Sequence, residues 1–272
     1  FRFPIKRGQP LSDWAVVSRP AQVNKVQSWS IEPRRSRVYS TWMDVSRDGL
    51  IAAGFGDGCV RLYDADLRLI RIHAEHANVV AGNESLAFSP DGAWLAAACT
   101  GKTLEEAARP GSGETPGKIL IWDVRSGQRV YEQAQPLYTA RIRWSPDSSV
   151  LAVGGDAGKI TFHELQTGRV TELKPASPNE YGVSSMAWSP AGDRLAAFYW
   201  HQSNSSKVRI FNVQTMQPLR EIPVATGPRN VDWSADGRWL AFADEEQVRI
   251  HETQNYTLER TIPQPEVWWL QF

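Results

Sequence analysis

The stretch LAFSPDGAWLAAAC, residues 86–99, decides the fold. Its first three residues alternate large and small apolar side chains, which suits a strand with two unlike faces. Ser-Pro-Asp-Gly then supplies turn chemistry, because proline fixes φ, aspartate bonds to its own backbone and glycine accepts a positive φ. The apolar run from Trp94 to Cys99 is too short for an ordinary helix and is typical of a strand covered on both faces. The stretch therefore predicts a β-hairpin.

The same hairpin pattern occurs four more times along the chain. The copies are WMDVSRDGLIAAGF (42–55), IRWSPDSSVLAVGG (142–155), MAWSPAGDRLAAFY (186–199) and VDWSADGRWLAFAD (231–244). In all five, one residue stands immediately before the turn: Val45, Phe88, Trp144, Trp188 and Trp233. The intervals between these residues are 43, 56, 44 and 45 residues, so the sequence repeats with one insertion. We expect the three tryptophans to occupy equivalent places on innermost strands, packed between adjacent units.

A second motif follows each hairpin, a β-branched strand that ends in an aromatic residue or histidine and a polar residue. Its copies lie at 60–64, 119–123, 160–164, 208–212 and 248–252, and a sixth, VQSWS, lies at 26–30. Shorter strand-like pieces come next, as at 69–73, 129–133 and 219–223. Each period thus holds four short strands and no helical pattern. Four-stranded antiparallel units at a period of roughly 40–45 residues predict an all-β fold, a β-propeller of such blades.

Two stretches, GDGCVRLYD (56–64) and GKILIWDVRSG (117–127), resemble the WD40 repeat. The second holds the one intact Trp-Asp pair, Trp122-Asp123, while other repeats have Tyr-Asp, His-Glu, Phe-Asn or Trp-Ser. The Gly-His that usually precedes the innermost strand is absent, so the resemblance implies that the family's buried Asp-His-Ser-Trp network is incomplete in most blades. The WSPDG turn is also similar to TolB-type propellers, but the VRLYD-type strand favours WD40.

The resemblance covers residues 25–272, which we interpret as the propeller. Residues 1–24 form an N-terminal segment that could supply a degenerate first hairpin. The final EVWWLQF is similar to an innermost strand. Two accounts fit: six blades that close when the C-terminal strand joins the N-terminal blade, or an incomplete seven-bladed ring. We favour the incomplete ring, as part of a longer chain.

Composition agrees with a folded domain and limits the classes of partner. The chain has 272 residues, of which 42% are hydrophobic, and its 30 Lys and Arg balance its 30 Asp and Glu. A net charge of zero gives no general attraction to nucleic acid or to a membrane surface, so we expect no nucleic-acid partner. No apolar stretch reaches the ~20 residues that span a bilayer. We expect Cys59 and Cys99 to be small buried thiols and the protein to be cytoplasmic.

No motif of the sequence predicts catalysis, a metal or a cofactor. TGKT (100–103) lacks the earlier glycine of a phosphate-binding loop, because that position is Ala96. HAEH (73–76) offers two histidines and one glutamate without a further ligand at fixed spacing, so we interpret it as a solvated loop. His163 and His251 replace tryptophan at the ends of repeat strands, which indicates structural roles.

Two long connections between the second and third strands of their blades are the candidate binding region. They are residues 100–117 and 199–207, whereas the equivalent connection at 154–159 is short. We expect both to emerge on one face and to flank a recess over the central channel, where loops on a rigid scaffold commonly bind partners. The candidate contact residues are Lys102, Glu105, Glu106, Tyr199, Trp200 and His201. In the alternative interpretation, Tyr199 and Trp200 continue their strand and pack against a neighbouring blade.

The resemblance implies a non-catalytic propeller that serves as a scaffold or sensor for protein partners within a larger protein or complex. The alternative is a propeller that gates or carries a hydrolase-type active site.

Overall fold

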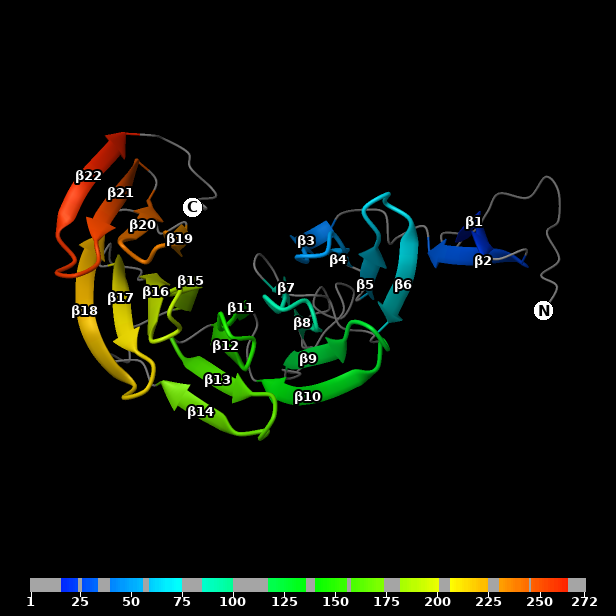
Figure 1. Ribbon diagram of the computed structural model, residues 1–272, viewed down its shortest axis with the longest axis horizontal. Coiled ribbons are helices and arrows are strands. Elements are labelled where there is room, and N and C mark those ends of the chain that lie inside the picture. The colour runs from blue at the N-terminus through cyan, green and yellow to red at the C-terminus, as the bar shows by residue number, and fades with distance from the viewer. Residues whose placement is uncertain are drawn as a thin grey trace, which may run out of the picture.

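The described part of the chain consists of five four-stranded antiparallel sheets and one hairpin, without a helix. The computed structural model describes residues 16–23, 26–33, 40–55, 59–74, 85–99, 117–135, 140–155, 158–173, 182–200, 206–224, 230–244 and 246–263. We call the sheets blades 1 to 5 in chain order. In each blade the strands pair in sequence order, the first lying inside an arc of blades and the fourth outside (Figure 1).

The strand bounds follow the predicted repeats. Blade 1 is β3 (Ser40–Val45), β4 (Ile51–Phe55), β5 (Cys59–Tyr63) and β6 (Leu69–Ala74). Blade 2 is β7 (Leu86–Phe88), β8 (Trp94–Cys99), β9 (Gly117–Asp123) and β10 (Arg129–Gln135). Blade 3 is β11 (Ala140–Trp144), β12 (Val150–Gly155), β13 (Ile160–Glu164) and β14 (Val170–Leu173). Blade 4 is β15 (Gly182–Trp188), β16 (Arg194–Trp200), β17 (Ser206–Asn212) and β18 (Gln217–Val224). Blade 5 is β19 (Asn230–Trp233), β20 (Trp239–Ala243), β21 (Gln247–Glu252) and β22 (Leu258–Pro263).

The prediction of an all-β propeller with four-stranded blades is therefore confirmed. The sixth copy of the second motif falls in a separate hairpin, β1 (Val16–Val23) paired with β2 (Val26–Pro33). This hairpin runs across the predicted boundary after residue 24, and the division into 1–24 and 25–272 stays a prediction. The EVWWLQF segment, on which the choice between six and seven blades depends, lies outside the described residues.

A buried serine organises the turn between the first and second strands of every blade. The Ser89 hydroxyl accepts a hydrogen bond from the Trp94 backbone N–H at 2.9 Å, and so ties the start of the second strand to the end of the first. The same bond recurs at the other four turns, from Ser46, Ser145, Ser189 and Ser234. This recurrence explains why the turn pattern is the clearest repeat in the sequence.

The third turn departs from the others at its left-handed position. Four turns have glycine there, and the third has Ser148 with a φ of 62°. A non-glycine residue in this region is strained. The Ser148 hydroxyl accepts a hydrogen bond from the Asp91 backbone N–H at 3.1 Å. Serine in place of glycine at this position thus adds a hydrogen bond between the turns of blades 2 and 3.

Three tryptophans join neighbouring blades, as the sequence predicts. Trp144, Trp188 and Trp233 are between 5% and 9% exposed. Each indole N–H donates to a backbone carbonyl of the preceding blade at 3.1–3.2 Å. The acceptors, Ala87, Arg143 and Ala187, each stand immediately before the residue that is equivalent to the tryptophan. The bonds therefore repeat in register from one interface to the next.

The interface between blades 1 and 2 is built differently. Phe88 occupies the tryptophan position and has no ring N–H, and its backbone N–H donates to the Asp44 carboxylate at 2.7 Å. Arg71 on β6 donates to the Val124 carbonyl at 2.9 Å, and the His73 ring lies 4.7 Å from the Trp122 ring. Val45, at the equivalent position in blade 1, is 60% exposed, because no described blade precedes blade 1.

Candidate partner-binding surfaces

Trp200 is the last residue of β16, and its side chain is 43% exposed. Tyr199 beside it is 1% exposed. The Tyr199 ring packs on Phe211 at 6.4 Å between ring centroids, and the Arg209 guanidinium lies 5.0 Å from the Tyr199 centroid. Successive strand side chains point to opposite faces, so only one of the pair can face solvent. Tyr199 is therefore removed from the candidate contacts, and the alternative interpretation holds for it.

The other predicted contact residues, Lys102, Glu105, Glu106 and His201, lie outside the described residues. The strands that flank the two connections are described. Cys99 pairs with Lys118 at one connection, and Tyr199 pairs with Lys207 at the other. Both connections therefore join the second and third strands at the same end of equivalent blades. That they form one partner surface stays a prediction.

The two histidines that end repeat strands, His163 and His251, contact other side chains inside the protein. His163 is 1% exposed, and its two ring nitrogens lie 2.8 Å from the Tyr131 hydroxyl and 2.9 Å from the Thr161 hydroxyl. Burial lowers the pKa of His163 to about 4. His251 stacks on the Phe242 ring at 5.1 Å. The structural roles predicted for His163 and His251 are confirmed.

His73 also packs inside the protein, but Glu75 and His76 of the HAEH stretch lie outside the described residues. Within the described ranges, no three His, Cys, Asp or Glu side chains lie together as a metal site would require. No helix in that part of the chain is long and apolar enough to cross a membrane. Neither Cys59 nor Cys99 is in a disulfide. Cys99 is buried, as the sequence predicts, whereas Cys59 is only half-buried.

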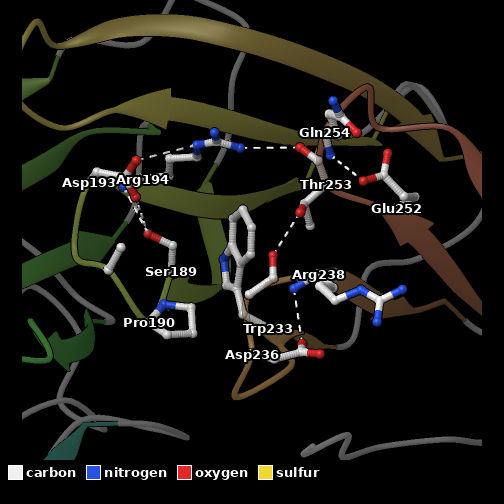
Figure 2. Close-up of a pocket in the computed structure, with 12 residues that line it drawn as sticks. Ser189, Pro190, Asp193, Arg194, Trp233, Asp236, Arg238, Glu252, Thr253 and Gln254 are labelled. Atoms are coloured by element: carbon white, nitrogen blue, oxygen red, sulfur yellow. Dashed lines mark hydrogen bonds and ion pairs between the residues drawn. The ribbon is translucent and has the colours of Figure 1, made fainter.

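A pocket that the sequence did not indicate lies between blades 4 and 5 (Figure 2). Its volume is about 670 Å³, and three turns line it, at 189–194, 233–238 and 252–254. We call it the turn-face pocket. Because β16 runs from Arg194 to Trp200, the pocket and Trp200 lie at opposite ends of the same strand. The pocket is therefore distinct from the predicted loop surface.

Arg194 connects the two blades at one side of the turn-face pocket. Its guanidinium donates from Nη1 to the Thr253 carbonyl at 3.1 Å and to the Tyr256 hydroxyl at 3.0 Å. Its Nε lies 3.6 Å from the Asp193 carboxylate. Burial raises the pKa of Tyr256 above its ordinary value of 10.0. The Arg194 guanidinium is therefore already bonded to groups of the protein.

Two carboxylates lie on the blade 5 side of the pocket. Asp236 Oδ1 accepts hydrogen bonds from the Ser234 hydroxyl and the Arg238 backbone N–H, and these bonds lower the pKa of Asp236. The Glu252 carboxylate accepts backbone N–H bonds from Gln254 and Asn255 at 2.7 and 3.0 Å. Both side chains are held in place by their own turns.

The equivalent positions of the turn serines are the only feature of the sequence that bears on this pocket. Ser189 and Ser234 mark equivalent turns of adjacent blades, so turns 189–194 and 233–238 had to lie on one face. The hollow between them depends on side-chain volumes, which the repeat pattern does not contain.

Comparison with known proteins gives two family matches. Residues 142–236 match the model described as the anaphase-promoting complex subunit 4 WD40 domain. Residues 68–105 match the model described as WD domain, G-beta repeat. Together these matches include strands of blades 1 to 5.

Among curated proteins, the chain is 30% identical over 149 residues to the WD repeat-containing protein SL1-17 of Schistosoma mansoni, covering 53% of this chain and 46% of that protein. It is 28% identical over 175 residues to the antiviral protein SKI8 of Saccharomyces cerevisiae, covering 60% of this chain and 43% of that protein. The chain thus spans less than half of the length of these relatives. Among solved structures, the Cps50 (Swd1) β-propeller domain from Myceliophteria thermophila superposes with a TM-score of 0.62 at 18% identity, covering 82% of this chain and 71% of that one.

Proposed function

Because this chain is a WD40-repeat β-propeller, we propose that it acts as a non-catalytic scaffold that holds protein partners through the connections at one end of its blades. Fold alone does not define a function, so the proposal depends on the surface that the blades present. The exposed Trp200 at the end of β16 is the observation that carries it.

Tryptophan is enriched among the interface residues that contribute most to affinity, because its large ring buries much area at a small cost in conformational entropy. Trp200 stands on a firmly held strand, since its neighbour Tyr199 is buried in the core shared by blades 3 and 4. A rigid aromatic side chain beside a long connection suits a partner contact. The residues 100–116 and 201–205 would complete the contact from the same end of the blades.

The family model that matches residues 142–236 is named for a subunit of a protein complex, which supports a role within an assembly. We also propose that the protein acts in the cytoplasm. Cys59 and Cys99 do not form a disulfide, which agrees with this location because disulfides are rare in reducing compartments.

Affinity capture tests this function. The tagged chain is used as bait in an extract of its source cells, and the captured proteins are compared with those of the Trp200→Ala variant. Trp200→Ala should weaken capture by about 1–3 kcal/mol of binding free energy. Leu219→Ala is the matched control, because Leu219 is 48% exposed on the outer strand of the same blade.

Equal loss with Leu219→Ala, or capture unaffected by Trp200→Ala, would contradict the proposed surface. Hydrolysis of a model ester by the purified chain alone would contradict its non-catalytic character.

A further inference from the structure

We propose that the turn-face pocket binds a basic side chain, arginine or lysine, presented by a peptide segment of a partner. The pocket lies at the opposite end of β16 from Trp200, so this inference does not depend on the proposed partner surface.

The shape of the pocket suits one long side chain and the backbone beside it. Its volume of about 670 Å³ lies within the usual range of ligand pockets. Figure 2 shows Trp233 at its centre, with Pro190 on one side and Thr253 on the other. Pro190 is exposed and Trp233 is 5% exposed, so the Pro190 ring and the accessible part of Trp233 form a narrow apolar strip. The methylene stem of arginine or lysine packs well on such a strip while its charged end stays near polar groups.

The charges around the strip favour a cation. Three carboxylates line the pocket, those of Asp193, Asp236 and Glu252, against two guanidiniums, those of Arg194 and Arg238. The Arg194 guanidinium already bonds to the Thr253 carbonyl and the Tyr256 hydroxyl and lies beside Asp193. Arg194 and Asp193 therefore offset each other, which leaves the carboxylates of Asp236 and Glu252 against the Arg238 guanidinium.

The second guanidinium turns away from the strip. Arg238 extends away from Trp233 in Figure 2, and its guanidinium carbon lies 5.5 Å from the Trp239 ring centroid. In contrast, Asp236 Oδ2 accepts no hydrogen bond from the described residues, since both of its bonds end on Oδ1. Asp236 thus keeps a carboxylate oxygen for a ligand cation, at the edge of the apolar strip.

The walls are preorganised, which lowers the cost of binding. The Thr253 hydroxyl donates to the Gly237 carbonyl at 2.6 Å, and the Thr253 backbone N–H donates to the Arg238 carbonyl at 3.0 Å. These bonds fix the two turns of blade 5 to each other, and Arg194 fixes them to blade 4.

Fluorescence anisotropy with the purified 272-residue chain tests the inference. The probe is a fluorescein-labelled pentapeptide, Gly-Gly-Arg-Gly-Gly, compared with the same peptide carrying uncharged citrulline and with one carrying glutamate. The arginine peptide should bind about five-fold more tightly than the citrulline peptide, as one screened ion pair allows. Asp236→Asn should remove most of this difference.

Pseudo-symmetry supplies a matched control. Asp147 stands at the same turn position in blade 3 and accepts the same serine bond, from Ser145, but it does not line the pocket. Asp147→Asn reproduces the loss of charge at a turn that Asp236→Asn causes, but it leaves the pocket intact. It should change the affinity for the arginine peptide by less than about two-fold. Glu252→Gln, with Glu164→Gln as its control, gives a second pair that avoids the serine bond altogether.

Equal effects of a variant and its control would overturn the inference, as would tighter binding of the glutamate peptide or no saturable binding of the arginine peptide. Capture through Trp200 could still succeed in each of these cases, so the failure of this inference is distinguishable from failure of the proposed function.

Discussion

The interface between blades 1 and 2 and the interface between blades 3 and 4 occupy equivalent places but use different chemistry. At blades 3 and 4 the Trp188 indole donates to the Arg143 carbonyl, and Phe162 packs edge-on against Trp188 at 5.8 Å. At blades 1 and 2 the Asp44 carboxylate, the Arg71 guanidinium and the His73 ring make the equivalent contacts. One interface depends on an uncharged donor, and the other includes an aspartate and a histidine, which can titrate.

This difference shows that the same arrangement of two blades can be stabilised by contacts that differ in their sensitivity to pH. An indole N–H keeps its proton at every pH at which the protein folds. A buried carboxylate or imidazole changes charge when the pH crosses its pKa, so its interface changes in stability. The two interfaces should therefore respond differently to acid and to substitution.

The largest expected effect is on the blade 3–4 interface. Trp188→Ala should lower the free energy of unfolding by about 3–5 kcal/mol, because a large buried ring leaves a cavity. Chemical denaturation followed by circular dichroism measures this loss. Trp188→Phe keeps most of the ring but leaves the Arg143 carbonyl without the indole donor, and it should cost about 1–2 kcal/mol. A loss below about 1 kcal/mol for Trp188→Ala would show that the interface does not depend on this ring.

Acid should act more strongly on the blade 1–2 interface. Burial, with a smaller contribution from Arg71, lowers the pKa of His73 to about 4. A histidine whose folded pKa lies below its unfolded value of 6.5 binds protons less tightly when folded. Its contribution to stability is thus fully present above pH 6.5 and is lost as the pH falls toward 4. The full pKa shift sets an upper limit to this loss on the order of 3 kcal/mol, which solvent screening reduces.

Denaturation of the wild type and His73→Phe between pH 7 and pH 4 measures this effect. His73→Phe keeps a ring on Trp122 but cannot titrate, so its stability should fall less in acid. Hydrogen exchange in β6 and β9 should accelerate at pH 5 before exchange in β15 and β16 does, since the described strands of blade 4 contain no histidine. If the wild type and His73→Phe lose the same stability in acid, protonation of His73 does not destabilise the folded protein.

A smaller effect is expected at Asp44 in the same interface. Asp44→Ala removes the acceptor of the Phe88 N–H and should cost about 1–3 kcal/mol at neutral pH. Asp44→Asn is the control, because it keeps an acceptor oxygen without the charge. Thermal unfolding should place Asp44→Asn close to the wild type and Asp44→Ala clearly below it.

The pH dependence of Asp44 has the opposite sign to that of His73. Burial raises the pKa of Asp44, and this exceeds the opposing effects of the Phe88 and Val45 backbone bonds. The folded state therefore binds the proton more tightly, and this stabilisation is present below the unfolded pKa of 3.8 and is lost as the pH rises through the raised value. Asp44→Asn should remove this dependence, and an unchanged pH profile would argue that Asp44 titrates normally.

The smallest effect is expected at Ser148, between blades 2 and 3. Ser148→Gly relieves a left-handed φ of 62° but loses the bond from the Asp91 N–H. These contributions oppose each other, so stability should change by less than about 1 kcal/mol. Ser148→Ala loses the bond and keeps the strain, and it should be the less stable of the two in urea denaturation. The reverse order would show that the strain of the left-handed φ is smaller than the cost of the flexibility that glycine adds to the unfolded chain.

The repeated parts of the fold could be predicted from sequence because each depends on a local pattern. Apolar alternation, the Ser-Pro-Asp-Gly turn and the β-branched third strand locate the strands of every blade. The position before the turn also predicts buried Trp144, Trp188 and Trp233, since packing between equivalent blades repeats with the sequence. Val45 shows the limit of this argument. It shares their register, but its exposure depends on whether a blade precedes it.

The parts that departed from the repeat could not be predicted in this way. Asp44 lies within a copy of the hairpin, yet its bond to Phe88 depends on the distance between two blades. Tyr199 and Trp200 are adjacent aromatic residues, and only their orientation on β16 separates the buried one from the exposed one. The turn-face pocket arises where Trp233, Pro190 and Thr253 from three separate turns leave a hollow, which no single stretch of sequence contains.

The tryptophan bonds also give the row of blades a direction. Each indole donates toward the N-terminal side and each carbonyl accepts from the C-terminal side, so blades 3 and 4 each carry one donor and one acceptor facing opposite neighbours. A tandem duplication of one whole period, wherever its break points fall, gives every new donor an acceptor. A duplication of part of a period leaves a mismatched pair inside the protein. Growth of such a chain by recombination is thus restricted to whole blades, whatever the surface loops contain.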